Sequence, residues 1–292
     1  MHKILKWLGI GLAGIVGILA IAIVTLSLSA NTRLNKKYQL QPRAVTIPTD
    51  PASLKAGEHL VSIYCMNCHG ENLAGTDFFN NPSLAVVDAS NLTAGIGGIG
   101  GEYSDLDWVR AIRHGADPQG KALFIMPAGD FHHFSDEDLG NIIAYLKSIP
   151  PVDRESNDFS ITLIGRVLLA AGAFGNVLNV ETIDHNGSRP DSPARGVTQE
   201  YGEYLVKTFG CRTCHGQGLS GGVGPEPGSP IAPNLTPGGN LQYWSGQDFV
   251  NNVRARRSEW MPFESLSKMT DSELQAIFMY LQSLPALEAT TK

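Results

Sequence analysis

The feature that most constrains this chain is a five-residue pattern, Cys-x-x-Cys-His, that occurs twice and uses every cysteine. The copies are CMNCH at 65–69 and CRTCH at 211–215, in a chain with four cysteines among 292 residues. Disulfide bonds would account for four cysteines but give no reason for a histidine to follow each pair. A four-thiolate zinc cluster fits the spacing but also leaves both histidines without a role.

Covalent haem of the c type accounts for every fixed position of the pattern. Two thiols add to the two vinyl groups of one porphyrin, and the histidine that follows them ligates the iron. The sequence therefore predicts two covalently bound haems c. The residues predicted to attach them are Cys65, Cys68, Cys211 and Cys214, with His69 and His215 as the proximal iron ligands.

The N-terminal segment predicts a membrane anchor. An uncharged apolar stretch runs from Trp7 to Ala30, after Lys3 and Lys6. At about 1.5 Å per residue it can cross a bilayer core of about 30 Å. Cleaved signal peptides have shorter apolar cores of about 7–15 residues. We therefore expect an uncleaved anchor, although the small residues at 27–30 would also suit a cleavage enzyme.

The second half of the chain repeats the landmarks of the first in the same order. GEHLVSIYCMNCHG at 57–70 aligns with GEYLVKTFGCRTCHG at 202–216, and SNLT at 90–93 aligns with PNLT at 233–236. Each half closes with a segment in which a capping signal precedes apolar residues at helical spacing. These segments are 134–152 and 269–287. The repeat predicts two similar haem domains.

The predicted organisation has five parts. Residues 1–30 form the transmembrane helix, 31–50 a linker, 51–152 the first haem domain, 153–195 an inter-domain linker with a helix, and 196–288 the second haem domain. The apolar stretch 161–180 is interpreted as a packed linker helix rather than a second span. Arg166, Asn176 and Asn179 interrupt it, and polar groups of this kind are costly inside a bilayer.

Two methionines are candidates for the sixth iron position. Of six methionines, Met126 and Met261 each precede a proline shortly before the closing helix of their domain. Their equivalent places in the repeat favour iron ligation over gap-filling in a core. His132 and His133 are the alternative ligands in the first domain, but they have no counterparts in the second and are expected at the surface.

Each half resembles a class I cytochrome c domain, and the whole resembles a membrane-anchored dihaem cytochrome c. The resemblance covers about residues 50–150 and 196–287 and rests on the two haem motifs, the Met-Pro pairs, the NLT stretches and the closing helices. It implies a mainly α fold. It also implies that the proximal histidine donates to the carbonyl of the residue before Asn-Leu, which is Pro233 in the second domain and Ser90 in the first.

The first domain is longer between its histidine and its methionine. His69 and Met126 lie 57 positions apart, against 46 for His215 and Met261. The extra residues include GIGGIGG at 95–101, which we expect to form a flexible loop near the haem edge. It is not a phosphate-binding loop, because no strand precedes it and no Lys-Ser/Thr follows it.

Six-coordinate haem iron favours electron transfer without catalysis, so no residue is assigned a catalytic role. We expect an electron carrier between a membrane or periplasmic donor and an acceptor such as a terminal oxidase, acting alone or as a subunit of a larger membrane complex. The expected location is the inner membrane, with the haem domains facing the periplasm or another extracytoplasmic space. The net charge of −6 argues against a nucleic-acid partner.

Two other functions remain as alternatives. A dihaem peroxidase or a thiosulfate-oxidising cytochrome would need one iron with a labile ligand. A third hypothesis is a binding module in which the haems only stabilise the fold.

Overall fold

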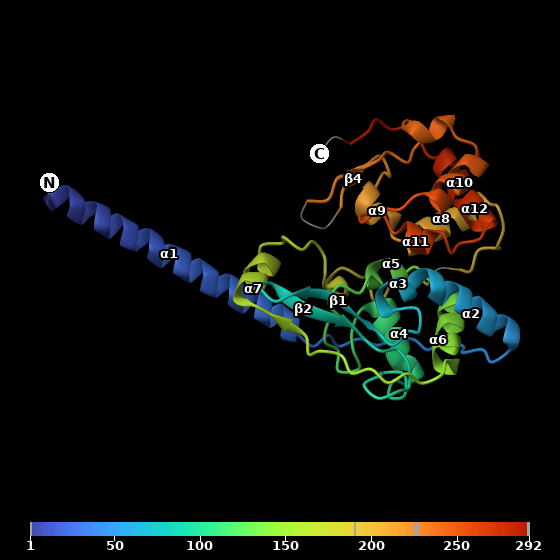
Figure 1. The fold of residues 1–292 in the computed structure, drawn as a ribbon, viewed down its shortest axis with the longest axis horizontal. Helices are drawn as coiled ribbons and strands as arrows, with labels where there is room; N and C mark the ends of the chain where they lie inside the picture. Colours follow the sequence, from blue (N-terminus) through green and yellow to red (C-terminus); the bar gives the residue numbers. More distant parts are fainter. Residues whose placement is uncertain (1, 190, 225–227, 291–292) are drawn as a thin grey trace.

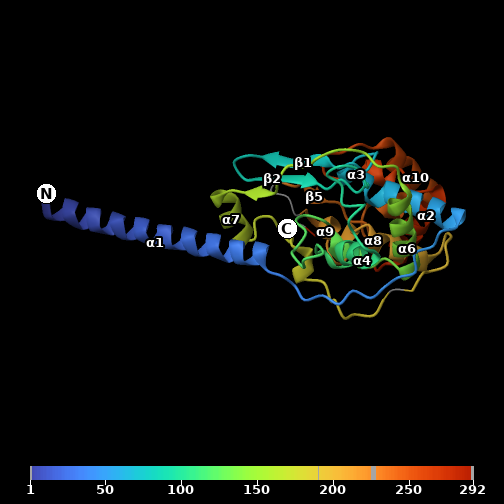
Figure 2. The same ribbon diagram turned by 90° about the horizontal axis from the view of Figure 1, so that it is seen from below.

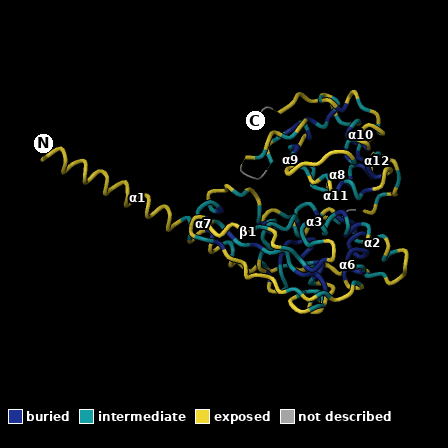
Figure 3. Tube along the Cα trace, viewed as in Figure 1, coloured by how far each residue is buried: buried dark blue, intermediate teal, exposed yellow. Residues whose placement is uncertain are grey.

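The apolar N-terminal segment forms one continuous helix, α1 (His2–Asn35), which projects from a body made of two lobes (Figure 1). The computed structural model describes residues 2–189, 191–224 and 228–290. The side chains of α1 are exposed along nearly all its length (Figure 3). Within the described residues, α1 is the one helix that is long and apolar enough to cross a membrane.

The C-terminal end of α1 is built into the first domain. Ala30 is fully buried and packs in a small apolar cluster with Leu169. The Arg33 guanidinium forms an ion pair with Glu181 at 2.6 Å. The helix therefore continues five residues into the predicted linker 31–50 and ends against the body rather than in a free tether.

Two crossing helices form the frame of the first domain, α2 (Pro51–Tyr64) and α6 (Asp136–Ser148). The Asp50 side chain caps α2 by accepting from two backbone amides, and the Ser135 hydroxyl caps α6. At the crossing, a Cβ on Gly57 would overlap the Asn141 carbonyl. Glycine is required there because the two backbones approach so closely.

The second domain repeats this frame with α8 (Gln199–Thr208) and α12 (Asp271–Ser283). A Cβ on Gly202 would overlap the Ala276 carbonyl, just as a Cβ on Gly57 would overlap the Asn141 carbonyl in the first domain. The predicted capping box of α12, made by Thr270 and Glu273, is present.

A third helix in each domain begins with the same kind of N-terminal cap. The helices are α4 (Asp105–His114) and α10 (Gly246–Ala255), and each begins with a Ser–Asp capping box. The shorter helices are α3 (Met66–His69), α5 (Ala128–Phe131), α7 (Leu163–Ala170), α9 (Cys211–His215) and α11 (Phe263–Leu266), with 3₁₀ turns η1 (Asn179–Glu181) and η2 (Asn240–Tyr243).

A hairpin follows the haem motif in each domain, and the sequence did not predict it. In the first domain β1 (Thr76–Asn81) and β2 (Ala85–Ala89) pair antiparallel, and β3 (Ser160–Ile161) adds to β2. In the second domain β4 (Gly222–Val223) and β5 (Ile231–Ala232) form a two-residue version. The long hairpin extends toward α7 and the end of α1 (Figure 2).

The segment after the first domain is largely packed on that domain. It supplies β3 and α7, and α7 contacts α1. The expected linker helix over 161–180 is shorter than predicted, because α7 ends at Ala170 and a turn with Gly172 at φ +78° follows. Residues 153–185 thus extend the first domain.

The glycine-rich segment 95–101 is a packed turn, so the prediction of a flexible loop was wrong. Added Cβ atoms on Gly95 and Gly97 would overlap the carbonyls of Val152 and Arg154. These glycines allow the turn to lie directly against the chain that leaves α6. Only two of the additional residues of the first domain fall here, three fall in the hairpin, and six lie between α4 and Met126.

The two domains meet through reciprocal contacts between equivalent positions. His59 on α2 contacts the Glu273 carboxylate at 2.9 Å, and Tyr204 on α8 donates to Asp138 at 2.6 Å. His59 and Tyr204 occupy the same place in the repeat, and so do Glu273 and Asp138. The interface therefore has an approximate two-fold relation, in which a carboxylate in the first turn of each closing helix binds the first helix of the other domain.

Candidate functional site

Each Cys-x-x-Cys-His pattern folds as a single helical turn directly after the first helix of its domain. Cys65 ends α2, and its carbonyl accepts from the amides of Cys68 at 3.2 Å and His69 at 2.9 Å. In the second domain α9 holds the equivalent turn. This turn brings both sulfurs and the imidazole to one stretch of surface, as attachment of one porphyrin requires.

The proximal imidazoles are held in one tautomer in both domains. Nδ1 of His69 lies 2.8 Å from the Ser90 carbonyl, and Nδ1 of His215 lies 2.8 Å from the Pro233 carbonyl. A carbonyl can only accept, so Nδ1 carries the proton and Nε2 keeps a lone pair for a metal. Burial lowers the pKa of both histidines, which favours the neutral, ligating form.

The loop after each turn carries the same backbone strain. Leu73 and Leu219 occupy equivalent positions and have φ of 59° and 58°. Non-glycine residues in this left-handed region are uncommon and concentrate at functional sites. Both leucines are buried, and their carbonyls accept from the amides of Leu92 and Leu235 at 2.8 Å. These bonds hold the segments that carry Ser90 and Pro233.

Two buried asparagines also hold the segments whose carbonyls accept from the proximal histidines. The sequence did not predict this role. Nδ2 of Asn91 donates to the Val152 carbonyl at 2.8 Å, and Nδ2 of Asn234 donates to the Leu287 carbonyl at 2.7 Å. Each asparagine ties the histidine-supporting segment to the chain that follows the closing helix. The repeated Asn-Leu-Thr triplet was the signal that could have identified them.

A large cavity in the second domain brings together all the predicted groups of that domain. Its volume is about 520 Å³, within the range of about 300–1,000 Å³ typical of ligand pockets. The lining includes Cys211, Cys214, His215, Pro233 and Met261, with apolar walls from Leu235, Leu241, Trp244, Phe249, Phe263, Leu266, Ile277 and Leu281. Two thiols, one imidazole, one thioether and an apolar wall fit a covalently attached porphyrin with two axial ligands.

The first domain places the equivalent groups on the main hydrophobic cluster, which runs through both domains. Met126 and Cys65 both pack against the main hydrophobic cluster. Met126 and Met261 each precede a proline and a short helix, and their carbonyls accept from Ala128 at 2.8 Å and Phe263 at 2.7 Å. The two methionine loops therefore share one backbone arrangement.

What holds the two methionine loops differs. Ile125 precedes Met126 with φ of 68°, and its amide donates to the Val177 carbonyl of the inter-domain segment at 2.8 Å. The amide of Met261 instead donates to the Ser258 hydroxyl in its own loop at 3.2 Å. The first loop is thus covered by another part of the chain, whereas the second is held locally.

The remaining histidines have partners or lie at the surface. His133 is exposed, whereas His132 is half-buried and its Nδ1 lies 3.3 Å from the Arg113 carbonyl. His59 contacts Glu273 across the domain interface. His114 and His185 lie with their Nδ1 atoms 2.9 Å apart.

The zinc alternative requires the thiols to converge. Among the described residues, no three His, Cys, Asp or Glu side chains come together as a metal site would require. Burial also raises the pKa of Cys65 and of Cys211 to about 12, which disfavours the thiolates that zinc binds. The arrangement therefore favours thioether attachment of haem in each domain separately.

Comparison with known proteins gives one matching family. The family model described as cytochrome c oxidase, cbb3-type, subunit III matches residues 52–146 and again residues 198–281. The two matches coincide with the two copies of the helical frame and of the haem-attaching turn.

The curated proteins include several similar cytochromes. A diheme cytochrome c-type protein of Cereibacter sphaeroides is 27% identical over 92% of this chain and 97% of its own length. The cytochrome subunit of fructose dehydrogenase from Gluconobacter japonicus is 27% identical over 82% of this chain but 55% of its own length. The cytochrome c subunit of gluconate 2-dehydrogenase from Pantoea cypripedii is also 27% identical, over 82% of this chain and 61% of its own length.

Proposed function

The chain belongs to the family described as cytochrome c oxidase, cbb3-type, subunit III, and on that premise we propose how it binds its haems and exchanges electrons. It is an electron-transfer protein with two covalently bound haems c. Its own residues provide attachment, iron ligation and an apolar enclosure. The haems supply the reversible one-electron chemistry when bound.

The proposed iron ligands are His69 with Met126 in the first domain and His215 with Met261 in the second. The observation that carries this assignment is the second-domain cavity, which His215 and Met261 line together with both thiols. The two backbone carbonyls that accept from the histidines orient each ring and increase the electron density on Nε2. Methionine as the second ligand raises the reduction potential.

The contacts between domains support electron transfer within the chain. The short helix after each methionine lies against the other domain: α5 contacts α8, and α11 contacts α2 and α3. Tyr64, directly before the first haem motif, bonds to Thr208 at 2.9 Å and its ring lies 6.0 Å from that of Phe209. We therefore propose that electrons pass between the two haems across this interface.

The proposed setting is the periplasmic face of the inner membrane, with α1 as an uncleaved anchor. Three features support it: the length of α1, its exposed apolar side chains and the packing of its end into the first domain. The proposed donor is the catalytic subunit of a membrane-associated dehydrogenase, because several relatives are cytochrome subunits of dehydrogenases and α1 can anchor this chain. A terminal oxidase or another periplasmic carrier would then accept the electrons.

Optical spectra of the purified full-length protein test the ligand assignment. A pyridine haemochrome assay should count two haems c per chain, and the oxidised protein should show the weak red absorption of methionine–iron bonds. Carbon monoxide should leave the reduced spectrum unchanged, because six-coordinate iron has no free position. Ready binding of carbon monoxide by the unaltered protein would instead favour the haem-enzyme alternative.

Methionine variants then assign each haem. Met126→Ala and Met261→Ala should each convert one of the two haems to a high-spin, carbon monoxide-binding form. Each should also lower one reduction potential by on the order of 0.1 V or more. The matched control is Met279→Ala, since Met279 is 43% exposed on α12 and should change neither property. A low-spin spectrum retained in either loop variant would refute that ligand.

A further inference from the structure

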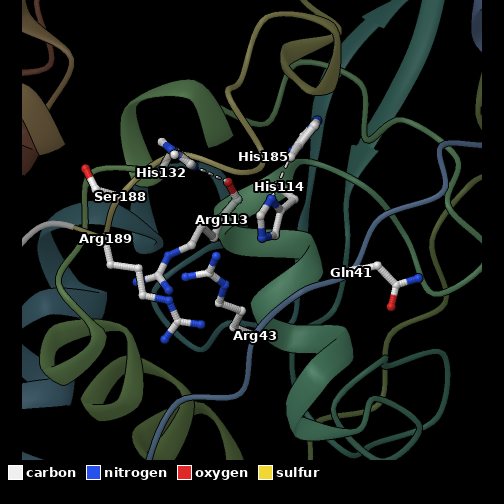
Figure 4. Close-up of a pocket in the computed structure, with 9 residues that line it drawn as sticks. Gln41, Arg43, Arg113, His114, His132, His185, Ser188 and Arg189 are labelled. Carbon is white, nitrogen blue, oxygen red and sulfur yellow. Dashed lines mark hydrogen bonds between the residues drawn. The ribbon is translucent and has the colours of Figure 1, made fainter.

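A pocket in the first domain lies apart from the haem-binding groups. It is bounded by the end of α4, the chain that leaves α1 and the inter-domain segment before residue 190 (Figure 4). Its lining residues are Gln41, Arg43, Arg113, His114, His132, His185, Gly187, Ser188 and Arg189. None of these is a cysteine, histidine or methionine assigned to a haem.

The pocket holds more positive than negative charge. The Arg113 guanidinium bonds to Asp136 at 2.7 Å, and Arg189 contacts the other oxygen of the same carboxylate. Arg43 has no ion pair or hydrogen bond with any described residue, yet its guanidinium points to the region where the other two gather (Figure 4). Asp136 therefore pairs with two of the three guanidinium groups, and Arg43 has no ion pair with a described carboxylate.

A buried donor in the pocket is unsatisfied. Arg113 is 3% exposed, and its Nε–H has no partner among the described residues. This atom is itself enclosed by protein, so Arg113 contributes positive charge to the pocket rather than a donor that a ligand can reach.

The pair of histidines, His114 and His185, adds one hydrogen-bond acceptor to the pocket. Nε2 of His185 lies 2.9 Å from the Val180 carbonyl, which can only accept, so Nδ1 of His185 is the acceptor toward His114. Nδ1 of His114 must then carry its proton, which leaves Nε2 of His114 with a lone pair on the guanidinium side (Figure 4). Burial, aided by nearby positive groups, lowers the pKa of His114 to about 4, so the ring is neutral near pH 7.

The second domain shows that the fold does not require this cluster. Arg254, the counterpart of Arg113, bonds to Asp271 at 2.8 Å and to the Met269 carbonyl. The same two bonds in the first domain join Arg113 to Asp136 and the Phe134 carbonyl. Ala255 stands in the place of His114. The structural bonds are complete in the second domain without the additional arginines and histidines.

We propose that this pocket binds a small oxyanion that carries a proton, of which hydrogen phosphate is the type. Its charged oxygens accept from the guanidinium groups of Arg43 and Arg189, and Arg113 adds positive charge beside them. Its O–H donates to Nε2 of His114. The interior volume of about 20 Å³ receives part of the ion while the rest stays in water.

Calorimetric titration of the full-length holoprotein in detergent with inorganic phosphate at pH 7 tests the site. We expect one phosphate per chain. Arg43→Gln should weaken binding roughly tenfold, because it removes one charge-assisted donor. The matched control is Lys55→Gln, since Lys55 is also exposed and unpaired among the described residues but lies on α2, outside the lining. Absence of binding, or an equal effect of both variants, overturns the proposal.

Sulfate tests the role of the proton. Sulfate has no O–H at pH 7, so it should bind the unaltered protein roughly tenfold more weakly than phosphate. His114→Ala should remove this preference, and the helix should tolerate the change because the second domain has alanine at this position. Equal binding of sulfate and phosphate by the unaltered protein overturns the assignment of a protonated anion.

Discussion

The two haem domains share the turn that attaches the haem but differ in what surrounds the methionine loop. In the first domain the inter-domain segment covers this loop and Val177 accepts from Ile125. In the second domain the loop is held by Ser258, and the neighbouring Trp260 is 41% exposed. The comparison teaches that the repeat conserves the backbone of the methionine loop, whereas the contacts that hold this loop differ between the domains.

The interface adds a second contrast between equivalent groups. Glu273 and Asp138 both lie in the first turn of a closing helix and both bind the other domain, yet their carboxyl pKa values shift in opposite directions. Burial opposes ionisation of Glu273, but hydrogen bonds from His59 and Thr270 outweigh it and lower the pKa to about 2. Burial dominates at Asp138 and raises its pKa despite Arg195 and Tyr204.

The largest expected effect tests the shared frame. Gly57→Ala and Gly202→Ala should each destabilise the protein by about 3 kcal/mol, because a Cβ would overlap a carbonyl at the helix crossing in either domain. Chemical unfolding of the holoprotein measures this. Gly246→Ala is the control, since its Cβ would meet only ordinary contacts at 3.6 Å. A large effect in one domain alone would show that the two frames are not equivalent.

The opposite pKa shifts of Glu273 and Asp138 should change how stability depends on pH, an effect of similar or smaller size. A lowered folded-state pKa makes the contribution of Glu273 present above about pH 4.5 and lost as pH falls toward 2, a change of about 3 kcal/mol. The raised pKa of Asp138 gives the opposite sign, so its contribution is present at low pH and lost as pH rises.

Urea unfolding between pH 3 and 7 separates these two contributions. Glu273→Gln should flatten the acid-induced loss of stability, and Asp138→Asn should steepen it. Both substitutions keep the size of the side chain, and glutamine can still serve in a capping box. Parallel pH profiles for the two variants would contradict the assignment of opposite shifts.

The smallest expected effect tests the local support of the second methionine loop. Ser258→Ala removes the acceptor for the amides of Trp260 and Met261, at a cost of about 1 kcal/mol. Loss of the methionine–iron absorption on warming should then occur at lower temperature for the second haem only. Ser258→Thr, which keeps the hydroxyl, should restore it, whereas an equal change at both haems would argue against independent loops.

Much of the fold was predictable because its signals are local. The haem pattern and the capping residues act within one or two helical turns, and the repeat of both predicted two equal domains. The prediction of a dihaem c-type cytochrome is confirmed by the family match to both halves. The iron ligands stay a prediction, although the structure places Met261 and His215 in one cavity.

The features that the sequence did not predict depend on contacts between distant residues. His59 and Glu273 are 214 positions apart, and neither belongs to a pattern that indicates the other. The hairpin of the first domain gains its third strand from the inter-domain segment, which no local signal places there. The pocket beside His114 likewise joins α4 to His185 and Arg189, which lie more than seventy positions later in the chain.

With α1 as the proposed membrane anchor, its buried end limits how the haems can move relative to the bilayer. Ala30 is enclosed by the first domain and Arg33 is paired with Glu181, so the helix axis and the body turn together. An electron partner in the same membrane then meets the haems at a nearly constant height and orientation. Encounter becomes a search in two dimensions with few rotational choices, whereas a flexible tether would let the body sample a hemisphere of positions.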